Sequence, residues 1–323
     1  MKILVIGDLH FKQDNAEESE ILIENIIKIV KKTQPNQIVI LGDILHNHGT
    51  IYLYPLKRAV EFLKCLCELS ETYLIIGNHD RPNPKVFLTD EHPFNALKKW
   101  EKIKVVDKTI IEYPFVYVPY VETGRFMEAI KDVDITKVKA FFAHQEFRGS
   151  IRSDRGDIWP PNYPPVISGH IHKHAVYKNI FYTGTPLQHS FFEPPENYVF
   201  LFNFPENVNE INYSKLDTCT PKKILIKTSA NDVKNDIKKL LKNINSENKY
   251  LIIVEDDGSF DEVKLLKKIE KFRKEIRVII SKNYRSEVEN MKNQRSFKSF
   301  IERLKEKIEG DENCKKWFEI IFG

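Results

Sequence analysis

The chain has 323 residues, of which 41% are hydrophobic and 30% charged, and its formal net charge is +4. A chain of this length can bury a large core and is expected to form about two domains. No apolar run approaches the roughly 18 residues of a membrane span, and the four cysteines indicate neither a disulfide framework nor a zinc motif. The N-terminus enters an apolar run without a charged leader. We therefore expect a soluble intracellular protein, in the cytoplasm of a bacterium or virus-infected cell, or in a nucleus.

The charge is divided unevenly along the sequence. Residues 221–323 hold 25 Lys and Arg against 18 Asp and Glu, a net charge of +7, whereas residues 1–220 carry −3. All ten histidines lie at or before His189, so metal chemistry is expected in the first part. The basic second part could contact a polyanion such as nucleic acid, or it could simply present a Lys-rich surface to water.

In chain order, the first part alternates short apolar runs with helical patterns. Ala16–Lys32 and Tyr54–Leu69 each have an apolar face at helical spacing, and residues 92–100 predict a shorter helix. The apolar runs are short and rich in β-branched and aromatic residues, which indicates buried strands. The strands are expected at Lys2–Ile6, Gln37–Leu41, Tyr73–Ile76, Ile103–Val106, Thr109–Glu112, Phe115–Val118, Val138–Ala143, Pro165–Ser168, Ala175–Lys178, Ile180–Thr183 and Tyr198–Phe204. This order predicts an α/β fold in which the later strands close a second sheet.

A second, smaller alternation follows a polar stretch between Pro205 and Pro221, where the first domain is expected to end. The expected elements are strands at Lys222–Lys227, Tyr250–Glu255 and Ile276–Ser281 and helices at Asn231–Lys242 and Asp261–Lys274. They predict a small α/β domain over residues 221–282, then a linker and a C-terminal helix within residues 283–323. An apolar stripe recurs in that helix at Phe297, Ile301, Leu304 and Ile308. The stripe suits packing on its own domain or docking to a partner.

Five polar motifs of the first part each come directly after an apolar run. They are Asp8-Leu9-His10, Gly42-Asp43, Gly77-Asn78-His79-Asp80, His144 and Gly169-His170-Ile171-His172. Ligands of an open sheet flanked by helices bind at the carboxyl ends of its strands, so these side chains are expected to meet at one edge. Together, Asp, Asn and His form a mixed oxygen and nitrogen set that suits divalent metal ions.

Each motif alone has an ordinary explanation. An Asp-x-His pair is usually a surface coincidence, a single His144 is more often a core histidine, and Gly-Asn-His-Asp could form a turn. Five such groups in order, each at a strand end, make coincidence a poor explanation. Two ions joined by a bridging carboxylate can activate water, neutralise phosphoryl oxygens and assist a leaving alkoxide. A carboxylate is the usual bridge because its two oxygens can bind different ions, and Asp43 is the best candidate because it follows the small Gly42 at a strand end and lies second in the motif order.

In this set and order, the motifs resemble those of the calcineurin-like metallophosphoesterase superfamily. Within it, the chain is similar to the SbcD-type nuclease subunits, also called the meiotic recombination eleven family. The subfamily features are Gly42-Asp43-Ile44-Leu45-His46, Val118-Pro119-Tyr120-Val121, Tyr182–Pro186 and Ser190-Phe191-Phe192-Glu193. The resemblance implies a two-sheet sandwich flanked by helices over residues 1–215, a capping domain over 221–282 and a C-terminal partner-binding helix.

The resemblance also implies a ligand set for two divalent ions. Manganese is the family's usual ion, and the oxygen and nitrogen donors are also compatible with magnesium, iron or zinc. The first ion would be held by Asp8, His10, Asp43 and His172, and the second by Asp43, Asn78, His144 and His170. His79 would face the scissile phosphate with Asp80 orienting its ring, and His46 would approach the substrate. The remaining nearby histidines, expected to be supporting or surface residues, are His48, His174 and His189.

The implied activity is cleavage of DNA phosphodiesters, as a 3′-to-5′ exonuclease on duplex DNA and an endonuclease on single strands and hairpins. The implied partner is a coiled-coil SbcC-type ATPase, in a complex for double-strand-break repair and recombination, bound through the Phe297–Ile308 stripe. A homodimer through helices of the phosphoesterase domain, including Tyr54–Leu69, is implied as well. The chain has no phosphate-binding loop of the G-x-x-x-x-G-K-[ST] type, so it is not expected to hydrolyse ATP itself.

Two alternatives stay open. The same centre could serve a phosphomonoesterase or a small-molecule phosphodiesterase. Protein phosphatases of the superfamily typically have Arg soon after the Gly-Asp motif and Glu at the end of the third motif, whereas this chain has Ile44-Leu45-His46 and Asp80. The other alternative is a DNA-tethering subunit without activity. It is disfavoured because all seven ligand positions hold competent residues.

Overall fold

A computed structural model describes residues 1–150, 155–205, 212–229, 231–233, 244–256 and 276–282. The chain divides into two compact units, Met1–Leu225 with Asn245–Leu251 and Ile226–Ile244 with Ile252–Gly323. The helix expected at Asp261–Lys274, most of that at Asn231–Lys242 and the C-terminal helix lie outside the described residues. No helix in the described ranges has the length and hydropathy needed to cross a bilayer.

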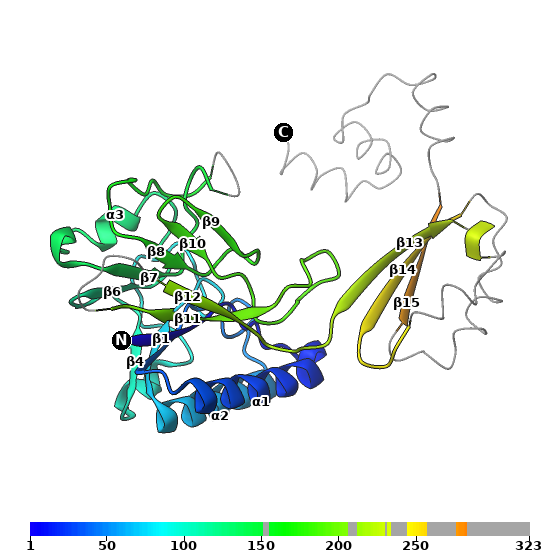
Figure 1. Cartoon of the computed structure of the whole chain (residues 1–323), viewed down its shortest axis with the longest axis horizontal. Coiled ribbons are helices and arrows are strands. Elements are labelled where there is room, and N and C mark those ends of the chain that lie inside the picture. The colour runs from blue at the N-terminus through cyan, green and yellow to red at the C-terminus, as the bar shows by residue number, and fades with distance from the viewer. Residues whose placement is uncertain (151–154, 206–211, 230, 234–243, 257–275, 283–323) are drawn as a thin grey trace, which may run out of the picture. The chain divides into compact units, whose positions relative to one another are not determined.

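The first unit contains two six-stranded sheets (Figure 1). The first sheet has the order β12-β11-β1-β2-β3-β4, with β1 to β4 parallel and β11 and β12 antiparallel. Its strands are β1 Lys2–Ile6, β2 Gln37–Ile40, β3 Glu71–Ile75, β4 Ile103–Val106, β11 Tyr198–Asn203 and β12 Asn212–Asp217. β1, β2 and β3 are joined through two α-helices, the crossover connections that parallel neighbours require.

The second sheet has the order β5-β6-β7-β8-β10-β9. Its strands are β5 Ile110–Glu112, β6 Phe115–Val118, β7 Ala140–Ala143, β8 Val166–Ser168, β9 Ala175–Tyr177 and β10 Ile180–Tyr182. The four inner strands are parallel, and the edge strands β5 and β9 are antiparallel to their neighbours. The expected α/β fold with two sheets is therefore confirmed.

The helices lie mainly against the first sheet. α1 (Ala16–Thr33) and α2 (Leu53–Leu69) connect β1 to β2 and β2 to β3, and run side by side along one face (Figure 1). The helix expected over residues 92–100 is a single 3₁₀ segment, Asn95–Lys99. The remaining short elements are 3₁₀ helices Gln13–Asn15 and Ile135–Lys137 and α3, Phe126–Ala129.

Alternate residues of each central strand enter different cores, because successive side chains of a strand point to opposite faces. In β1, Leu4 and Ile6 pack with the buried faces of α1 and α2. Ile3 and Val5 instead belong to the core between the two sheets, with Phe142 of β7. Burial on both faces explains why these strands read as continuous apolar runs.

The chain after residue 205 contains one strand that we did not predict and three that we did. Residues 212–217, expected to be part of a polar domain boundary, form β12 and pair with β11 along its whole length. This strand has little apolar alternation, because β12 is an exposed edge strand that pairs on one side only. The three strands expected after residue 220 are present as β13 Lys223–Ser229, β14 Lys249–Asp256 and β15 Ile276–Lys282. They form a third sheet in the order β13-β14-β15.

Candidate metal centre

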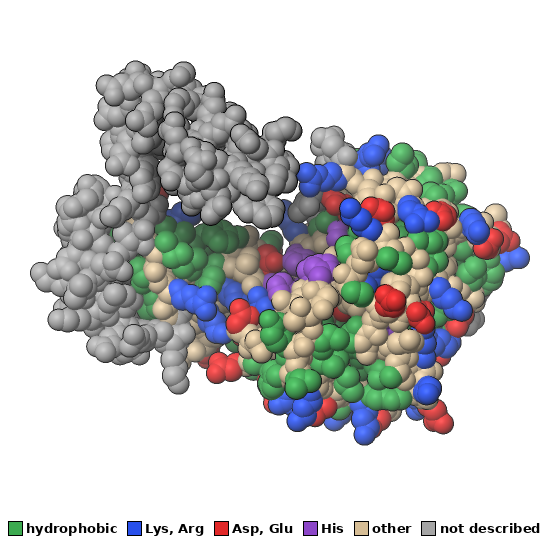
Figure 2. All heavy atoms as spheres, turned by 180° about the vertical axis from the view of Figure 1, so that it is seen from behind, with side chains coloured by type: hydrophobic (Ala, Val, Ile, Leu, Met, Phe, Trp, Pro, Cys, Tyr) green, Lys and Arg blue, Asp and Glu red, His purple; other side chains and the backbone are tan. Residues whose placement is uncertain are grey.

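The five polar motifs meet at strand ends that come from both sheets. Asp8, Asp43 and Asn78 follow β1, β2 and β3 of the first sheet, whereas His144 and His170 follow β7 and β8 of the second. We expected these side chains to meet at the edge of a single sheet, and this expectation is wrong. The site lies where the carboxyl ends of strands from two sheets come together. Histidine side chains reach the surface together at one place on the face seen in Figure 2.

A first group of ligand atoms gathers around His10 and His172. Their Nε2 atoms lie 3.0 Å apart. Asp8 Oδ2 is 3.8 Å from Nε2 of His172, and Asp43 Oδ2 is 3.6 Å from Nε2 of His10. Two nitrogen ligands about 2.1 Å from one ion lie roughly 3 Å apart when they subtend a right angle. This first group therefore has the spacing of ligands that share an ion.

A second group surrounds the amide of Asn78. Its Oδ1 lies 2.9 Å from His170 Nδ1 and 3.0 Å from His144 Nε2. The two ring nitrogens are 3.3 Å apart, and His144 Nε2 is also 3.3 Å from Asp43 Oδ2. The structure thus brings together all four residues expected to hold the second ion.

Asp43 belongs to both groups through a single oxygen. Oδ2 faces His10 on one side and His144 on the other. Oδ1 accepts a hydrogen bond from the backbone N–H of His79 at 2.8 Å. Oδ2 is therefore the oxygen of Asp43 that lies near ligand atoms of both groups, whereas Oδ1 bonds the third motif.

The motif glycines let backbone and ligand atoms approach one another closely. A Cβ atom at Gly77 would lie 2.2 Å from Asp43 Oδ1, and one at Gly169 would lie 2.4 Å from Asp8 Oδ1. Neither approach is compatible with a side chain. The glycines of the third and fifth motifs are thus required by the packing of the two carboxylates.

Three of the candidate ligand residues also have an unusual backbone. His10, Asp43 and His170 have φ angles of 43°, 49° and 71°, in the left-handed region that non-glycine residues seldom adopt. Hydrogen bonds hold two of them, since His10 N–H donates to Asp43 O at 2.9 Å and His170 N–H to Asp8 Oδ2 at 2.8 Å. Strained residues of this kind cluster at functional sites.

The electrostatics fit a site for cations. Asp8 is fully buried, and its Oδ1 has no hydrogen-bond partner among the described residues. Burial raises the pKa of Asp8 to about 6. Burial alone would lower the pKa of His144, but Asp43 and Asp8 raise it to about 9. An ion at this position would supply the positive charge that the buried carboxylates need, and the donor set of oxygen and imidazole nitrogen suits divalent ions.

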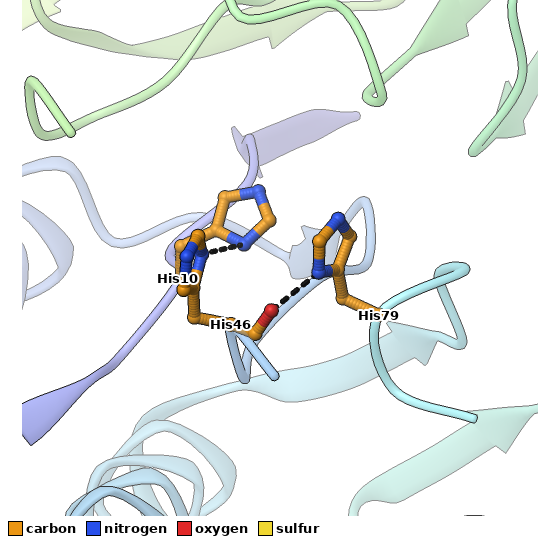
Figure 3. A group of neighbouring side chains, drawn as sticks. All are labelled: His10, His46 and His79. Atoms are coloured by element: carbon orange, nitrogen blue, oxygen red, sulfur yellow. Dashed lines mark hydrogen bonds between the residues drawn. The ribbon is translucent and has the colours of Figure 1, made fainter. Parts of the chain in front are cut away.

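Figure 3 shows His46 and His79 next to His10 of the first group. His46 Nδ1 is 3.4 Å from His10 Nδ1, and the His46 carbonyl contacts His79 Nδ1. Asp80 does not orient the His79 ring as expected. Its carboxylate accepts backbone N–H groups of Leu45 at 3.1 Å and Gly77 at 3.0 Å, so it ties the second motif to the third.

The other histidines take different places. The exposed ring of His48 lies on that of His79, with centroids 3.9 Å apart. His174 bonds the Tyr182 carbonyl through Nδ1 at 2.8 Å. His189 is buried, with its ring centroid 5.0 Å from that of His10. Sequence reasoning gave no role to Glu193, whose carboxylate lies 2.8 Å from His172 Nδ1.

Comparison with known proteins agrees with this geometry. A family model described as calcineurin-like phosphoesterase matches residues 1–174. A phosphoesterase-named protein, 078R, of Invertebrate iridescent virus 3 is 41% identical over 210 residues, which cover 61% of this chain and 60% of that protein. The similarly named 244L of Invertebrate iridescent virus 6 is 41% identical over 219 residues, 64% of this chain and 77% of the relative. Exonuclease subunit 1 of Enterobacteria phage T4 is 29% identical over 210 residues, 58% of this chain and 59% of that protein. The chain thus spans about three fifths of the length of two of these relatives.

Proposed function

The chain belongs to the calcineurin-like phosphoesterase family, and on that premise we propose that it is a dimetal-dependent nuclease that hydrolyses DNA phosphodiesters. The observation that carries the proposal is the position of Asp43 Oδ2 between two sets of ligand atoms, 3.6 Å from His10 Nε2 and 3.3 Å from His144 Nε2. Two divalent ions, when bound there, would supply the charge that activates water and neutralises the phosphoryl oxygens.

His79 is proposed to act on the scissile phosphate. Its Nδ1 contacts the His46 carbonyl and so carries the proton in the neutral ring, which leaves Nε2 to accept a proton at the substrate, or to donate one once the ring is protonated. That Nε2 lies 4.0 Å from Asp43 Oδ2, next to the bridging position. Burial lowers the pKa of His79. His46, half-buried beside it, is proposed to contact the substrate as well.

DNA is the proposed substrate for two reasons. One relative is a phage exonuclease subunit, and the third motif ends in Asp80 where protein phosphatases of the superfamily have Glu. The finer proposal is an SbcD-type catalytic subunit with 3′-to-5′ exonuclease activity on duplexes and endonuclease activity on single strands and hairpins. Manganese is the proposed ion and magnesium the alternative, because both accept oxygen and nitrogen ligands.

The test is incubation of the purified protein with Mn²⁺ and three substrates: labelled duplex DNA, bis-p-nitrophenyl phosphate and p-nitrophenyl phosphate. We expect cleavage of the two diesters, and none when EDTA is present. Turnover of the monoester with intact DNA would instead identify a phosphomonoesterase. Binding of DNA without turnover of any substrate would identify a tethering subunit.

We further propose a coiled-coil SbcC-type ATPase as the partner, and a homodimer of this chain, in a complex for double-strand-break repair and recombination. The support for the ATPase is the apolar stripe from Phe297 to Ile308, which lies outside the described residues. Phe297→Glu with Leu304→Glu should abolish capture of such an ATPase and leave manganese-dependent cleavage of short DNA unchanged. Ser299→Glu, off the stripe by helical spacing, is the matched control. Undiminished capture by the double variant would remove the stripe from the proposal.

A further inference from the structure

We propose that Glu193 is a positioning residue for the candidate metal centre, which holds the ring of His172 so that Nε2 faces the first ion. The inference rests on the dimetal centre of the proposed function, but not on which phosphoester is hydrolysed. Glu193 lies in the turn between β10 and β11, 21 residues beyond the histidine that it contacts.

Both carboxylate oxygens of Glu193 have hydrogen-bond partners. Oε1 lies 2.8 Å from Nδ1 of His172. Oε2 accepts the backbone N–H of His189 at 2.6 Å and that of Ser190 at 3.2 Å. Since both backbone groups can only donate, Oε2 must stay an acceptor, and the carboxylate is fixed with Oε1 directed at the imidazole.

The turn that carries Glu193 is itself anchored. The side chain of Gln188, which is buried, donates from Nε2 to the Glu193 carbonyl at 2.9 Å. The same amide pairs with the backbone of Lys223, donating to its carbonyl at 3.0 Å and accepting its N–H at 2.7 Å. The carboxylate is therefore held through its own backbone as well as through its oxygens.

This contact decides which nitrogen of His172 carries the proton. An acceptor at Nδ1 places the proton there and leaves the lone pair on Nε2, the atom that faces His10 Nε2 at 3.0 Å. Two backbone N–H groups donate to Oε2 of Glu193, and donors of this kind favour the charged form of a carboxylate. Anionic partners of this kind fix the ring and increase the basicity of a metal-bound histidine.

In the second group, the hydrogen bonds behind the imidazoles are made to neutral acceptors. His144 directs Nδ1 at the Leu41 carbonyl at 2.7 Å, while the carboxylate oxygen Oδ1 of Asp8 lies 3.7 Å from the same nitrogen, beyond hydrogen-bond distance. His170 directs Nδ1 toward the ligand atoms themselves, at Asn78 Oδ1. Loss of the Glu193 charge should therefore weaken the ion of the first group and spare that of the second.

The test is Mn²⁺ binding to Glu193→Gln, measured by electron paramagnetic resonance of the unbound ion without any substrate. Glutamine has the same shape as glutamate but can be placed in two orientations. In one, its N–H₂ group faces the backbone N–H donors of His189 and Ser190. In the other, the N–H₂ group donates to Nδ1 of His172, which puts the ring proton on Nε2. We expect one of two sites to weaken by about 10- to 100-fold. Glu196→Gln removes an exposed charge three residues away and should bind as wild type does.

A double-mutant cycle with His172→Ala separates positioning from a general effect on the fold. If Glu193 acts through His172, adding Glu193→Gln to His172→Ala should cause no further loss of affinity. Equal losses in both backgrounds, or wild-type affinity in Glu193→Gln alone, would overturn the proposal. A wild-type protein that binds fewer than two ions would contradict the proposed function instead, so the two failures are distinguishable.

Discussion

The two ligand groups of the candidate metal centre are built differently. The first group has its own carboxylate, Asp8, and a second anion, Glu193, behind one of its imidazoles. The second group has a neutral amide, Asn78, and shares the charge of Asp43. The difference indicates that charge would contribute more to holding the first ion, whereas neutral donors around one shared carboxylate would contribute more to holding the second.

The strongest test of this comparison is to remove the shared residue. Asp43→Ala should lose both ions, because its Oδ2 faces both groups. Metal-assisted stabilisation is worth several kcal/mol, so cleavage should fall by at least about a thousandfold. Metal analysis after gel filtration measures the stoichiometry. Two bound ions in this variant would show that the groups do not depend on a common bridge.

Removing His79 should separate chemistry from metal binding. His79→Ala should keep both ions, because the Asp43 bond uses the backbone N–H of residue 79. Cleavage should slow by about 10²- to 10⁴-fold, the usual contribution of a general acid or base. His48→Ala, which removes the exposed ring beside it, is the control and should stay within about tenfold of wild type. Steady-state rates with a diester at saturating Mn²⁺ give the comparison, and a lost ion would assign His79 to the ligands.

Removing the side-chain amide of Asn78 should weaken ion binding in the second group and not in the first. Asn78→Ala takes Oδ1 from the second group only, so one site should weaken by about 10- to 100-fold while the other stays as in wild type. Titration with Mn²⁺ followed by calorimetry resolves the two sites. Equal weakening of both would mean that the two groups act as one cooperative unit.

The smallest expected effect is that of pH on the two affinities. The second ion must displace a proton from His144, whose pKa is raised to about 9. The first must displace protons from Asp8, with a pKa near 6, and from His172, whose pKa burial alone would lower but the hydrogen bond to Glu193 raises. Each displaced proton makes affinity rise about tenfold per pH unit below the pKa of its group. Between pH 7 and 8.5, the second affinity should therefore rise more steeply than the first. Calorimetric titrations at both pH values measure this, and parallel slopes would contradict it.

The grouping of the candidate ligands could be predicted from the sequence because each motif follows a strand that is buried on both faces. The apolar run ends abruptly before Asp8 or Asp43, and the change from apolar to polar marks the position. Glu193 could not be found in this way. It lies in an irregular turn among Phe192 and Pro194, where no periodicity points to a partner, and only the folded chain brings it to His172.

Two other details needed the structure for different physical reasons. The ring of His79 was expected to be held by Asp80, the nearest acid in sequence, but short side chains at neighbouring positions often bond backbone instead. Asp80 does so at Leu45 and Gly77. The strand β12 was missed because hydrogen bonding to β11, rather than burial, determines it.

The close approach at the motif glycines has a consequence for how such centres are recognised. At Gly77 and Gly169 the absent side chain matters as much as the carboxylate beside it, because even one methyl group would collide with an oxygen. A homologue that keeps every chelating residue but replaces either glycine should be regarded as a degenerate copy. Genome surveys that score glycine with the same weight as aspartate and histidine would separate working members from decayed ones.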